Sequence, residues 1–404
     1  MKYIIINNCQ ICNKRLKKFI NLGKQPLCDD LLKNAKKNIF YKLEVKVCNN
    51  CLTAYQKFNI NKKKLFPKKY HYRSANTMDV ILGMKDLVEK VKSKTGNLKK
   101  KIVLDIGCND GSLLDIFKKY GAVTKGIEPT GAYKEAKKKG HDIYNVFFDE
   151  NISKKLRKKF DKIDIITFTN VFAHIENFKS LINSLKHLIS DKTLVVIENH
   201  YFREVVKKNQ FDTFYHEHPR TYSLNSFKHI SKLLNLKIID FNFVKRYNGN
   251  IRVFLKKSKK HSSKLNSELN KEKKLISGYS SFQKKIEKWK RHKKKELSLL
   301  NEKYGPIPAK AFPGRASILL NLLDLDSKSI EKIYEKNHSL KIGYYAPGTN
   351  IKIVREKELK KNINKKKVII NLAWHISKEI NRYLKKEFGF NGKVIDIISK
   401  KDFR

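Results

Sequence analysis

The stretch from Val103 to Ser112 constrains the fold more than any other part of the sequence. Its apolar start ends at Gly107, and a second glycine, Gly111, precedes apolar residues at helical spacing, which predicts a strand, a tight loop and a helix. A second apolar run, Val123 to Ile127, ends directly before Glu128. In doubly wound α/β folds, glycines at the first strand–helix turn admit a nucleotide, and an acid after the next strand binds its ribose. The stretch therefore predicts a nucleoside site in a Rossmann-like α/β domain.

The glycine spacing separates two classes of cofactor. Dinucleotide-binding loops use Gly-x-Gly-x-x-Gly to hold a pyrophosphate, whereas this loop has the pattern Asp-x-Gly-x-x-x-Gly with a further acid, Asp110, before the last glycine. A carboxylate there repels phosphate and attracts an ammonium group, which favours S-adenosylmethionine over NAD. The alternative is an ordinary glycine-containing turn. The predicted cofactor-binding residues are Asp105, Gly107, Asn109, Asp110, Gly111, Glu128 and Asn170.

The chain is strongly basic, with 90 Lys and Arg against 38 Asp and Glu and a formal net charge of +52. Such a charge is typical of proteins that bind nucleic acid. Here the lysines are spread over every segment while Arg is scarce and Asn and Ile are plentiful, so a genome-wide compositional bias explains the charge better. We therefore expect no nucleic-acid partner. The 404 residues, 40% of them hydrophobic, suffice for two or three domains.

No targeting segment is expected from the sequence. The apolar start, Met1 to Ile6, is too short for a signal peptide, and no apolar run is long enough to span a bilayer. We expect a cytoplasmic monomer or dimer without a membrane partner. In a reducing compartment, the six cysteines are expected to be thiols or metal ligands rather than disulfides.

Four cysteines form two Cys-x-x-Cys pairs, Cys9 with Cys12 and Cys48 with Cys51. Two such pairs present four thiolates to one tetrahedral zinc, and a small module gains folding free energy from the metal. The four-sulfur set is closed, so a structural rather than a catalytic zinc is predicted; four free thiols are the alternative. We assign residues 1–66 to this zinc module.

The α/β pattern continues after Glu128, with further strands expected at residues 142–148, 164–168 and 194–198. Ligands bind beyond the carboxyl ends of parallel strands. The residues expected to face one crevice at these ends are Gly107, Glu128, Asn170, His174, Glu198 and His200.

A second stretch, Phe211 to His218, contains four consecutive titratable residues: Tyr215, His216, Glu217 and His218. A histidine beside a glutamate is one arrangement that orients an imidazole as a general base near neutral pH. Consecutive ligands do not converge on one metal ion without a helical spacing. The remaining alternative is an exposed polar loop.

The rest of the chain predicts further elements. Tyr247 to Asn250 has the composition of a type I′ turn in a hairpin. Residues 256–303 are lysine-rich with helical apolar spacing, which predicts a helical connector, with a disordered linker as the alternative. Residues 304–404 have a second α/β pattern. We thus place the methyl-donor-binding domain at residues 67–255 and a C-terminal α/β domain at 304–404.

Several stretches together, over about residues 5 to 385, resemble one family: the three-domain C-methyltransferases that act on nucleotide-linked 4-keto-deoxysugars. Each stretch alone is weak, but their order and spacing are specific. They are the double Cys-x-x-Cys module, Leu22–Pro26, Tyr70–Ser74, Asp105–Gly111, Asn170–His174, Phe211–His218, Asn248–Arg252, Ile307–Lys310, Leu319–Asn321, Tyr345–Thr349 and Ala373–His375.

The resemblance implies a Rossmann-like S-adenosylmethionine domain between a structural zinc module and a C-terminal domain that helps to hold the nucleotide-sugar. It implies that His218 removes the proton α to the ketone. The other residues that it implies around the sugar are Glu217, Tyr215, His174, Tyr72 and Tyr70. The candidates for substrate binding are Asn199, His200, Asn248, Arg252, Lys310 and Asn321.

Two stretches depart from the family pattern. Asn248-Gly249-Asn250 replaces Gly-Gly-Ser, and the stretch after Lys310 carries the extra residues Phe312 to Arg315. Both lie where sugar and diphosphate specificity is expected. O- or N-methylation of a related sugar or metabolite therefore stays an alternative, as does, from the zinc module and the charge, a nucleic-acid methyltransferase or RNA-binding protein.

Overall fold

The computed structural model describes residues 3–35, 38–68, 70–76, 78–274 and 278–403. The chain forms two compact units, each built from several segments. The first unit comprises Met1–Lys18, Lys46–Val205 and Glu217–Ser277, and the second comprises Phe19–Val45, Val206–His216 and Gly278–Arg404. The chain therefore passes between the units several times, and each unit is described by itself. The domain boundaries expected from the sequence stay a prediction.

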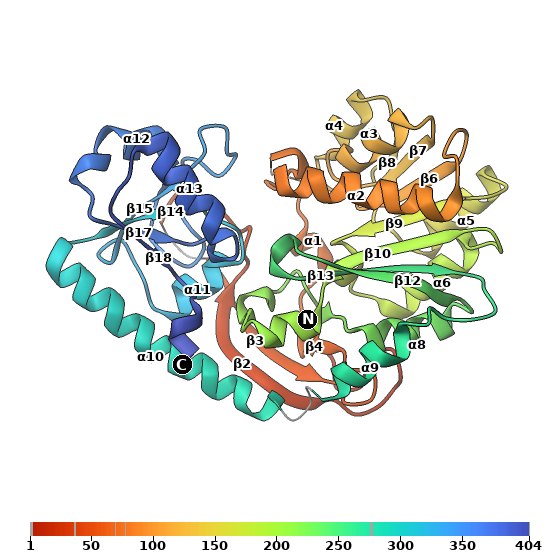
Figure 1. Ribbon diagram of the computed structural model, residues 1–404, viewed down its shortest axis with the longest axis horizontal. Coiled ribbons are helices and arrows are strands. Elements are labelled where there is room, and N and C mark those ends of the chain that lie inside the picture. Colours follow the sequence, from red (N-terminus) through yellow and green to blue (C-terminus); the bar gives the residue numbers. More distant parts are fainter. Residues whose placement is uncertain (1–2, 36–37, 69, 77, 275–277, 404) are drawn as a thin grey trace. The chain divides into compact units, whose positions relative to one another are not determined.

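A seven-stranded sheet forms the centre of the first unit (Figure 1). Its strands are β6 (Ile102–Ile106), β7 (Val123–Ile127), β8 (Asp142–Tyr144), β9 (Ile165–Thr169), β10 (Leu194–His200), β12 (Lys237–Val244) and β13 (Asn250–Lys256). The strand order is β12-β13-β10-β9-β6-β7-β8, and β13 is antiparallel to both of its neighbours. The strand order reverses between β6 and β9, which is where open α/β sheets bind their ligands. This is the Rossmann-like domain that the sequence predicts.

Both faces of this sheet are buried. Along β10, Leu194 and Val196 pack on one side, and Val195 and Ile197 pack on the other, as the alternation of side chains along a strand requires. The first face is covered by α2 (Met78–Thr95), α3 (Ser112–Lys119) and α4 (Tyr133–Lys138). The second face is covered by α5 (Glu150–Lys159), α6 (Phe178–Leu188), α8 (Leu224–Leu233) and α9 (Leu265–Lys273).

The hairpin of β12 and β13 exists, but its predicted type I′ turn is wrong. The paired residues nearest the turn are Val244 and Asn250, and the chain between them forms the 3₁₀ turn η4 (Arg246–Asn248). Arg246 is buried and donates to Glu198. In the longer loop Arg246 begins the 3₁₀ turn, and from there its side chain reaches Glu198.

The N-terminal part of the first unit contains short pairs of strands. Strand β1 (Ile4–Ile5) pairs with β5 (Phe58–Asn59), and β4 (Ala54–Gln56) pairs with β11 (Arg220–Thr221). The short helices of this unit are α1 (Lys62–Leu65), η1 (Ser74–Asn76), η2 (Phe172–His174) and α7 (Phe202–Lys207). Because β11 lies just after His218, the strand that follows the cysteine cluster is attached to the predicted catalytic stretch.

The second unit contains a five-stranded parallel sheet of order β16-β15-β14-β17-β18. Its strands are β14 (Ile307–Lys310), β15 (Ile330–Glu335), β16 (Ile353–Arg355), β17 (Val368–Asn371) and β18 (Lys393–Asp396). Its helices are α10 (Tyr279–Tyr304), α11 (Ala316–Leu322), α12 (Glu356–Lys361), α13 (Ser377–Phe388) and the short turns η3 (Phe211–Thr213), η6 (Ile363–Lys365), η7 (Trp374–Ile376) and η8 (Lys400–Phe403). Most of β2 (Lys17–Pro26) and β3 (Phe40–Val47), which are neighbours in a sheet, also belongs here.

The lysine-rich segment is helical, as the sequence predicts, but it forms two helices. Helix α9 belongs to the first unit and α10 to the second. On α10, Phe282, Ile286, Trp289 and Leu297 are buried at helical spacing, so most of its lysines occupy the other face. Lys293 is the buried exception and pairs with Glu296 and Asp402. Within the described part of the chain, no helix is both long and apolar enough to cross a membrane.

Candidate active site

Gly107 directly follows β6, and its backbone conformation together with its neighbours admits only glycine. Its φ of +73° lies in the left-handed region, and a Cβ would stand 2.5 Å from Cγ2 of Val171. Its N–H donates to the Ile127 carbonyl at 2.7 Å. The loop is thereby pressed between the end of β7 and the chain after β9, at the position where a nucleoside is expected.

Two acids hold the glycine loop in place: Asp110, which lies in the loop, and Glu128, which directly follows β7. Asp110 accepts hydrogen bonds from the N–H and the hydroxyl of Ser112, at 3.1 and 2.6 Å, and from the N–H of Ala75 at 2.8 Å. Glu128 accepts from the N–H and the hydroxyl of Thr130, at 2.9 and 2.6 Å, and from the N–H of Asn109 at 2.9 Å. Each carboxylate has about four acceptor positions, so each retains roughly one for a ligand.

Two buried acids, Asp105 and Glu128, lie beneath the loop, and each disfavours the negative charge of the other. Burial raises the pKa of Asp105 to about 7, although the Thr167 hydroxyl donates to it at 2.6 Å, and the charge of Glu128 raises it further. The pKa of Glu128 is also raised, mainly by burial. A cationic ligand relieves this repulsion and an anionic one increases it. The site therefore suits a sulfonium cofactor and not a pyrophosphate.

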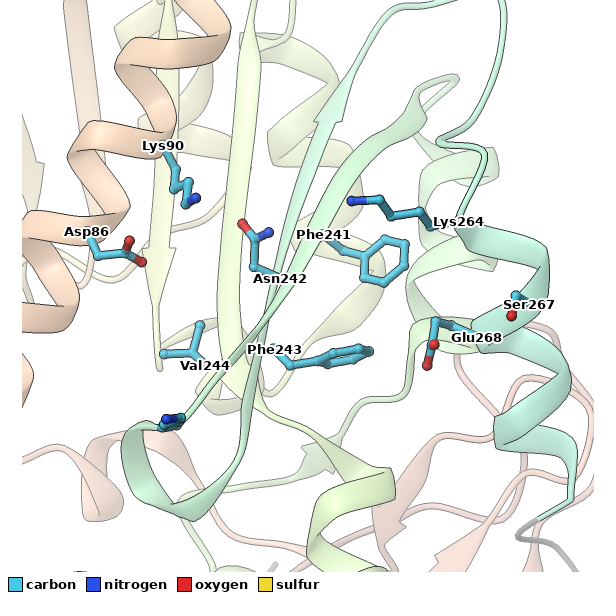
Figure 2. A pocket seen from close by; sticks show the side chains of 10 residues that line it. Asp86, Lys90, Phe241, Asn242, Phe243, Val244, Lys264, Ser267 and Glu268 are labelled. Atoms are coloured by element: carbon cyan, nitrogen blue, oxygen red, sulfur yellow. The ribbon is translucent and has the colours of Figure 1, made fainter.

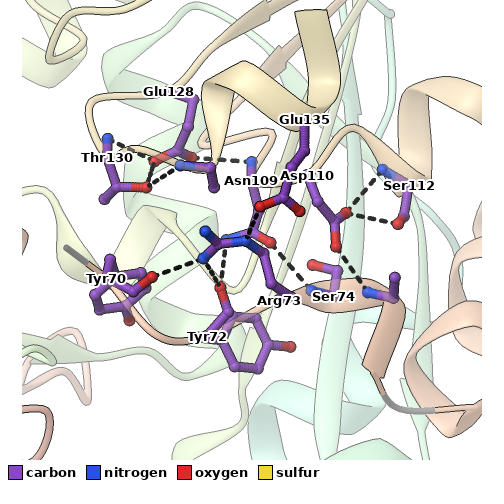
Figure 3. A network of polar contacts seen from close by, with 12 residues as sticks. Tyr70, Tyr72, Arg73, Ser74, Asn109, Asp110, Ser112, Glu128, Thr130 and Glu135 are labelled. Atoms are coloured by element: carbon purple, nitrogen blue, oxygen red, sulfur yellow. Dashed lines mark hydrogen bonds and ion pairs between the residues drawn. The ribbon is translucent and has the colours of Figure 1, made fainter. Parts of the chain in front are cut away.

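The segment from Tyr70 to Ala75 lies across the glycine loop (Figure 3). The N–H of Ser74 donates to Oδ1 of Asn109 at 3.0 Å, and Nδ2 of Asn109 donates to the Tyr72 carbonyl at 3.2 Å. Together with the bond from Ala75 to Asp110, these contacts attach the segment to the loop at three points.

The same segment reaches the predicted catalytic stretch. The Tyr70 hydroxyl donates to Oε2 of Glu217 at 3.0 Å. Arg73 holds the segment in shape, because it donates to the carbonyls of Tyr70 and Tyr72 at 2.6 and 2.8 Å and to Glu135 at 2.7 Å. One segment therefore joins the cofactor loop to the residue beside His218.

Three imidazoles meet around His218. Its ring stacks on His174 with a centroid distance of 4.9 Å and lies 5.2 Å from His200, while Phe66 covers the other side of His174 at 5.3 Å. His218 is buried. Burial, and then the charge of His218, hold the pKa of His174 well below its usual range. His174 therefore stays neutral at physiological pH, and its Nε2 has no hydrogen-bond partner within the described ranges.

The predicted substrate residues of the first unit have different surroundings. Asn199 is buried, and neither atom of its amide group has a hydrogen-bond partner in the described part of the chain. Arg252 is instead engaged with Glu198 at 2.8 Å, Asp86 at 2.7 Å and the Gly83 carbonyl. Asn248 lies in the hairpin loop with a φ of +62°. Arg252 as a substrate ligand thus stays a prediction, while its observed contacts are structural.

Glu198 does not face a crevice as expected. It is completely buried between Arg252 and Arg246, which donates to it at 2.6 Å. Asn170 is joined to this network through Asn250, whose amide donates to Asn170 at 3.0 Å and to Glu198 at 3.2 Å. The end of β10 is therefore fixed by a buried ion-pair network.

Three further predicted residues belong to the second unit. Tyr215 is partly buried. Lys310 is buried and donates to Glu356 at 2.6 Å, and the amide of Asn321 donates to the carbonyls of Ser317 and Pro347 at 2.7 and 3.0 Å. The contacts of Lys310 and Asn321 hold their own unit together, and their substrate roles stay predictions.

The four cysteines of the two pairs come together as predicted. Their sulfur atoms lie within 4.8 Å of one another, with Cys9 and Cys51 at 3.4 Å and Cys12 and Cys48 at 3.4 Å. No other group of metal-binding side chains converges in this way within the part of the chain that the structure describes. Four thiolates in a compact, mostly buried set fit a tetrahedral zinc with no open position. The Tyr55 hydroxyl, 3.1 Å from the Cys9 sulfur, supports the set from outside.

Replacing Cys12 by serine should remove the metal. We expect about one zinc per chain in the wild type, much less in Cys12→Ser, and a lower melting temperature, because metal binding supplies folding free energy. Metal analysis and thermal denaturation measure both. The control is Cys28→Ala, since Cys28 lies outside the cluster and contacts Ser317. Equal zinc content in the two variants would contradict a four-cysteine site.

A groove of about 690 Å³ lies elsewhere on the first unit (Figure 2). It runs along the edge strand β12 between residues of α2 and α9, and Phe243 is exposed in it. None of the predicted site residues lines it. The groove is therefore distinct from the candidate active site.

Models of known families match nearly all of the chain. Residues 9–66 match a "Putative zinc binding domain", residues 79–240 a "Methyltransferase domain" and residues 246–398 a "C-methyltransferase C-terminal domain". The chain belongs to the C-methyltransferase family. The models confirm the resemblance seen in the sequence and the presence of the methyltransferase and zinc-binding domains.

Individual relatives of this C-methyltransferase family member are distant. The C-methyltransferase NovU of Streptomyces niveus is 25% identical over 254 residues, which are 62% of this chain and 60% of NovU. A ubiquinone biosynthesis O-methyltransferase of Histophilus somni is 29% identical over 109 residues, 25% of this chain and 46% of that protein. The magnesium protoporphyrin IX methyltransferase of Synechocystis PCC 6803 is similar in structure, with a TM-score of 0.34 and 16% identity over 45% of this chain and 84% of that one.

Sequence reasoning missed several residues of the site. These residues hold the glycine loop, the segment across it or the backbone of His218. They are Arg73, Glu135, Thr130, Ala75 and Gln56. Thr130 follows Glu128 by two residues, a spacing typical of local side-chain turns, so it had a signal. Arg73 lies in the stretch Tyr70–Ser74, which carries part of the family resemblance. The contacts of Glu135, Ala75 and Gln56 join residues far apart in the chain and had no signal in the sequence.

Proposed function

We propose that the protein transfers a methyl group from S-adenosylmethionine to the carbon α to the keto group of a nucleotide-activated 4-keto-deoxysugar. The observation that carries the proposal is the segment Tyr70 to Ala75, which is bonded to the cofactor loop at Asn109 and Asp110 and to Glu217 beside His218. A methyl donor on the loop and an acceptor at His218 would then share one covered site. The similarity to NovU, a C-methyltransferase by name, and the match to the C-terminal domain model support the reaction type.

His218 is proposed as the base. Its imidazole takes the α-proton, the electrons of the C–H bond move into an enolate, and the imidazole becomes imidazolium. His174 stays neutral, and its Nε2 is available to the developing oxyanion as a donor or to the sugar hydroxyls as an acceptor. Tyr70 orients Glu217, and the carboxylate stabilises the imidazolium.

In the methyl transfer itself, the main task of the protein is to position the methyl donor and the acceptor carbon. S-adenosylmethionine supplies an electrophilic methyl group on a sulfonium centre. The enolate carbon forms the new C–C bond, the C–S bond breaks, and its electron pair stays on sulfur. Asp105, Asp110 and Glu128 would hold the positively charged donor, and Tyr70 to Ala75 would exclude water from the reacting atoms.

Exchange with solvent tests the proposal. The wild-type protein is incubated in heavy water with nucleotide-linked 4-keto-6-deoxyhexoses and without S-adenosylmethionine, and the α-proton signal is followed by NMR. We expect exchange of one α-proton with a keto-sugar and none with the same sugar reduced to the 4-alcohol, which forms no enolate. Adding S-adenosylmethionine should place a methyl group on that carbon.

The second candidate is O- or N-methylation, which the similarity to an O-methyltransferase over 109 residues favours. A hydroxyl or amine acceptor requires no enolate. Methyl transfer to oxygen or nitrogen without α-proton exchange would therefore select this candidate and exclude the first.

A further inference from the structure

One residue of strand β4 contacts the cysteine cluster, and the next contacts the backbone of His218. The Tyr55 hydroxyl is 3.1 Å from the sulfur of Cys9. The following residue, Gln56, donates from Nε2 to the backbone carbonyl of His218 at 3.0 Å. Successive side chains of a strand point to opposite sides, so β4 places one side chain at the metal ligands and one at the base.

The backbone of the same strand holds the residues just after the base. The N–H of Gln56 donates to the Pro219 carbonyl at 3.0 Å, and the strand pairs Tyr55 with Arg220 and Ala54 with Thr221. Gln56 and His218 are both buried, with 2% and 4% of their surface exposed. His218 therefore lies at the end of a short ladder of backbone hydrogen bonds inside the protein.

The backbone ladder between β4 and β11 ends at Pro219. Proline has no N–H, so Pro219 offers β4 a carbonyl but no donor. The Gln56 side chain adds one further hydrogen bond at this end of the ladder, to the carbonyl of His218. This contact fixes the peptide from which the His218 ring projects toward His174 and His200.

We infer that Gln56 is a positioning residue for the base: its amide holds the His218 carbonyl so that the imidazole is kept at the α-proton. The inference rests on the proposed function, because it takes His218 as the base. A base must lie within hydrogen-bond reach of the proton that it removes, and a shift of about 1 Å at such a group can cost about a hundredfold in rate.

The test compares two buried glutamines. Gln56→Met keeps the size of the side chain and removes the donor. The matched control is Gln25→Met, since Gln25 is 3% exposed and also donates to a backbone carbonyl, that of Leu22 at 2.7 Å, in the second unit. Both variants are assayed for α-proton exchange in heavy water, S-adenosylmethionine affinity, zinc content and melting temperature.

We expect Gln56→Met to slow exchange about tenfold or more with an unchanged midpoint of the pH–rate profile, because the same base acts from a poorer position. Cofactor affinity and zinc content should stay within about twofold of the wild type, and Gln25→Met should exchange normally. Normal exchange in Gln56→Met would overturn the inference, as would equal losses of exchange, cofactor affinity and zinc, which would mark Gln56 as a purely structural residue. Failure of the proposed function is separate, since the wild type itself would then show no exchange.

Discussion

Replacing His218 by alanine should abolish α-proton exchange and methyl transfer while the affinity for S-adenosylmethionine stays within about twofold of the wild type. A positioned general base accelerates a reaction about a hundredfold to ten thousandfold. The buried His218 ring contacts the imidazoles of His174 and His200. The cofactor loop is held through Asn109, Asp110 and Glu128, so removing the imidazole leaves these contacts in place.

Heavy-water exchange, single-turnover methyl transfer and calorimetric titration of the cofactor measure the three quantities. The matched control is His187→Ala, a histidine at the end of α6 in the same unit, which should leave all three unchanged. Exchange at the wild-type rate in His218→Ala would move the base to another residue. Equal loss of exchange and of cofactor affinity would show that His218 supports the fold of the site instead.

Replacing Glu198 by glutamine should be the most destabilising substitution in the first unit. The glutamine amide cannot balance the two guanidinium groups, Arg246 and Arg252, which are as fully buried as Glu198 itself. Breaking a buried ion pair by removing one partner costs about 3–5 kcal/mol of unfolding free energy. Urea denaturation, with hydrogen exchange of peptides from β10, β12 and β13, measures the loss. The control is Asp191→Asn, because the pair of Asp191 and Lys257 is exposed and should be worth less than about 1 kcal/mol.

The effect of Glu198 has a defined pH dependence. Burial raises the pKa of its carboxyl, but the charges of Arg246 and Arg252 outweigh burial and leave the pKa below its ordinary value. A carboxyl with a lowered pKa in the folded state stabilises the protein above its unfolded pKa of about 4.3 and loses this contribution as the pH falls through the lower folded value. The difference between the wild type and Glu198→Gln should therefore be constant near neutral pH and shrink only below about pH 4. A difference that grows in acid would contradict the ion-pair account.

The elements that the sequence predicts well are those set by local pattern. The run before Gly107 and the acid after Ile127 place the nucleoside loop, because a left-handed residue at a strand end and the period of a buried strand are both properties of a few consecutive residues. The two Cys-x-x-Cys pairs likewise predict a four-sulfur site, since each pair carries its own ligand spacing. The crowding of Tyr215, His216, Glu217 and His218 is also a local pattern, and their catalytic role stays a prediction.

The tertiary structure decides what these groups do to one another. Asp110 and Glu128 were predicted as ligands of the cofactor, and their carboxylates are largely engaged in holding Ala75, Ser112, Thr130 and Asn109. These partners come from several segments, and nothing in the sequence around either acid indicates Ala75 as a partner.

The same holds for the charged groups that the pattern placed at the crevice. Glu198 and Arg252 pair with each other, and Arg246, from the longer hairpin loop, is the second partner of Glu198. The His218 carbonyl is held by Gln56, from the strand that follows the last cysteine of the cluster. A sequence determines which residues are able to donate, accept or carry charge. Only the folded chain decides which partner each of them has, because the energy of a buried polar group depends on neighbours that are distant in the sequence.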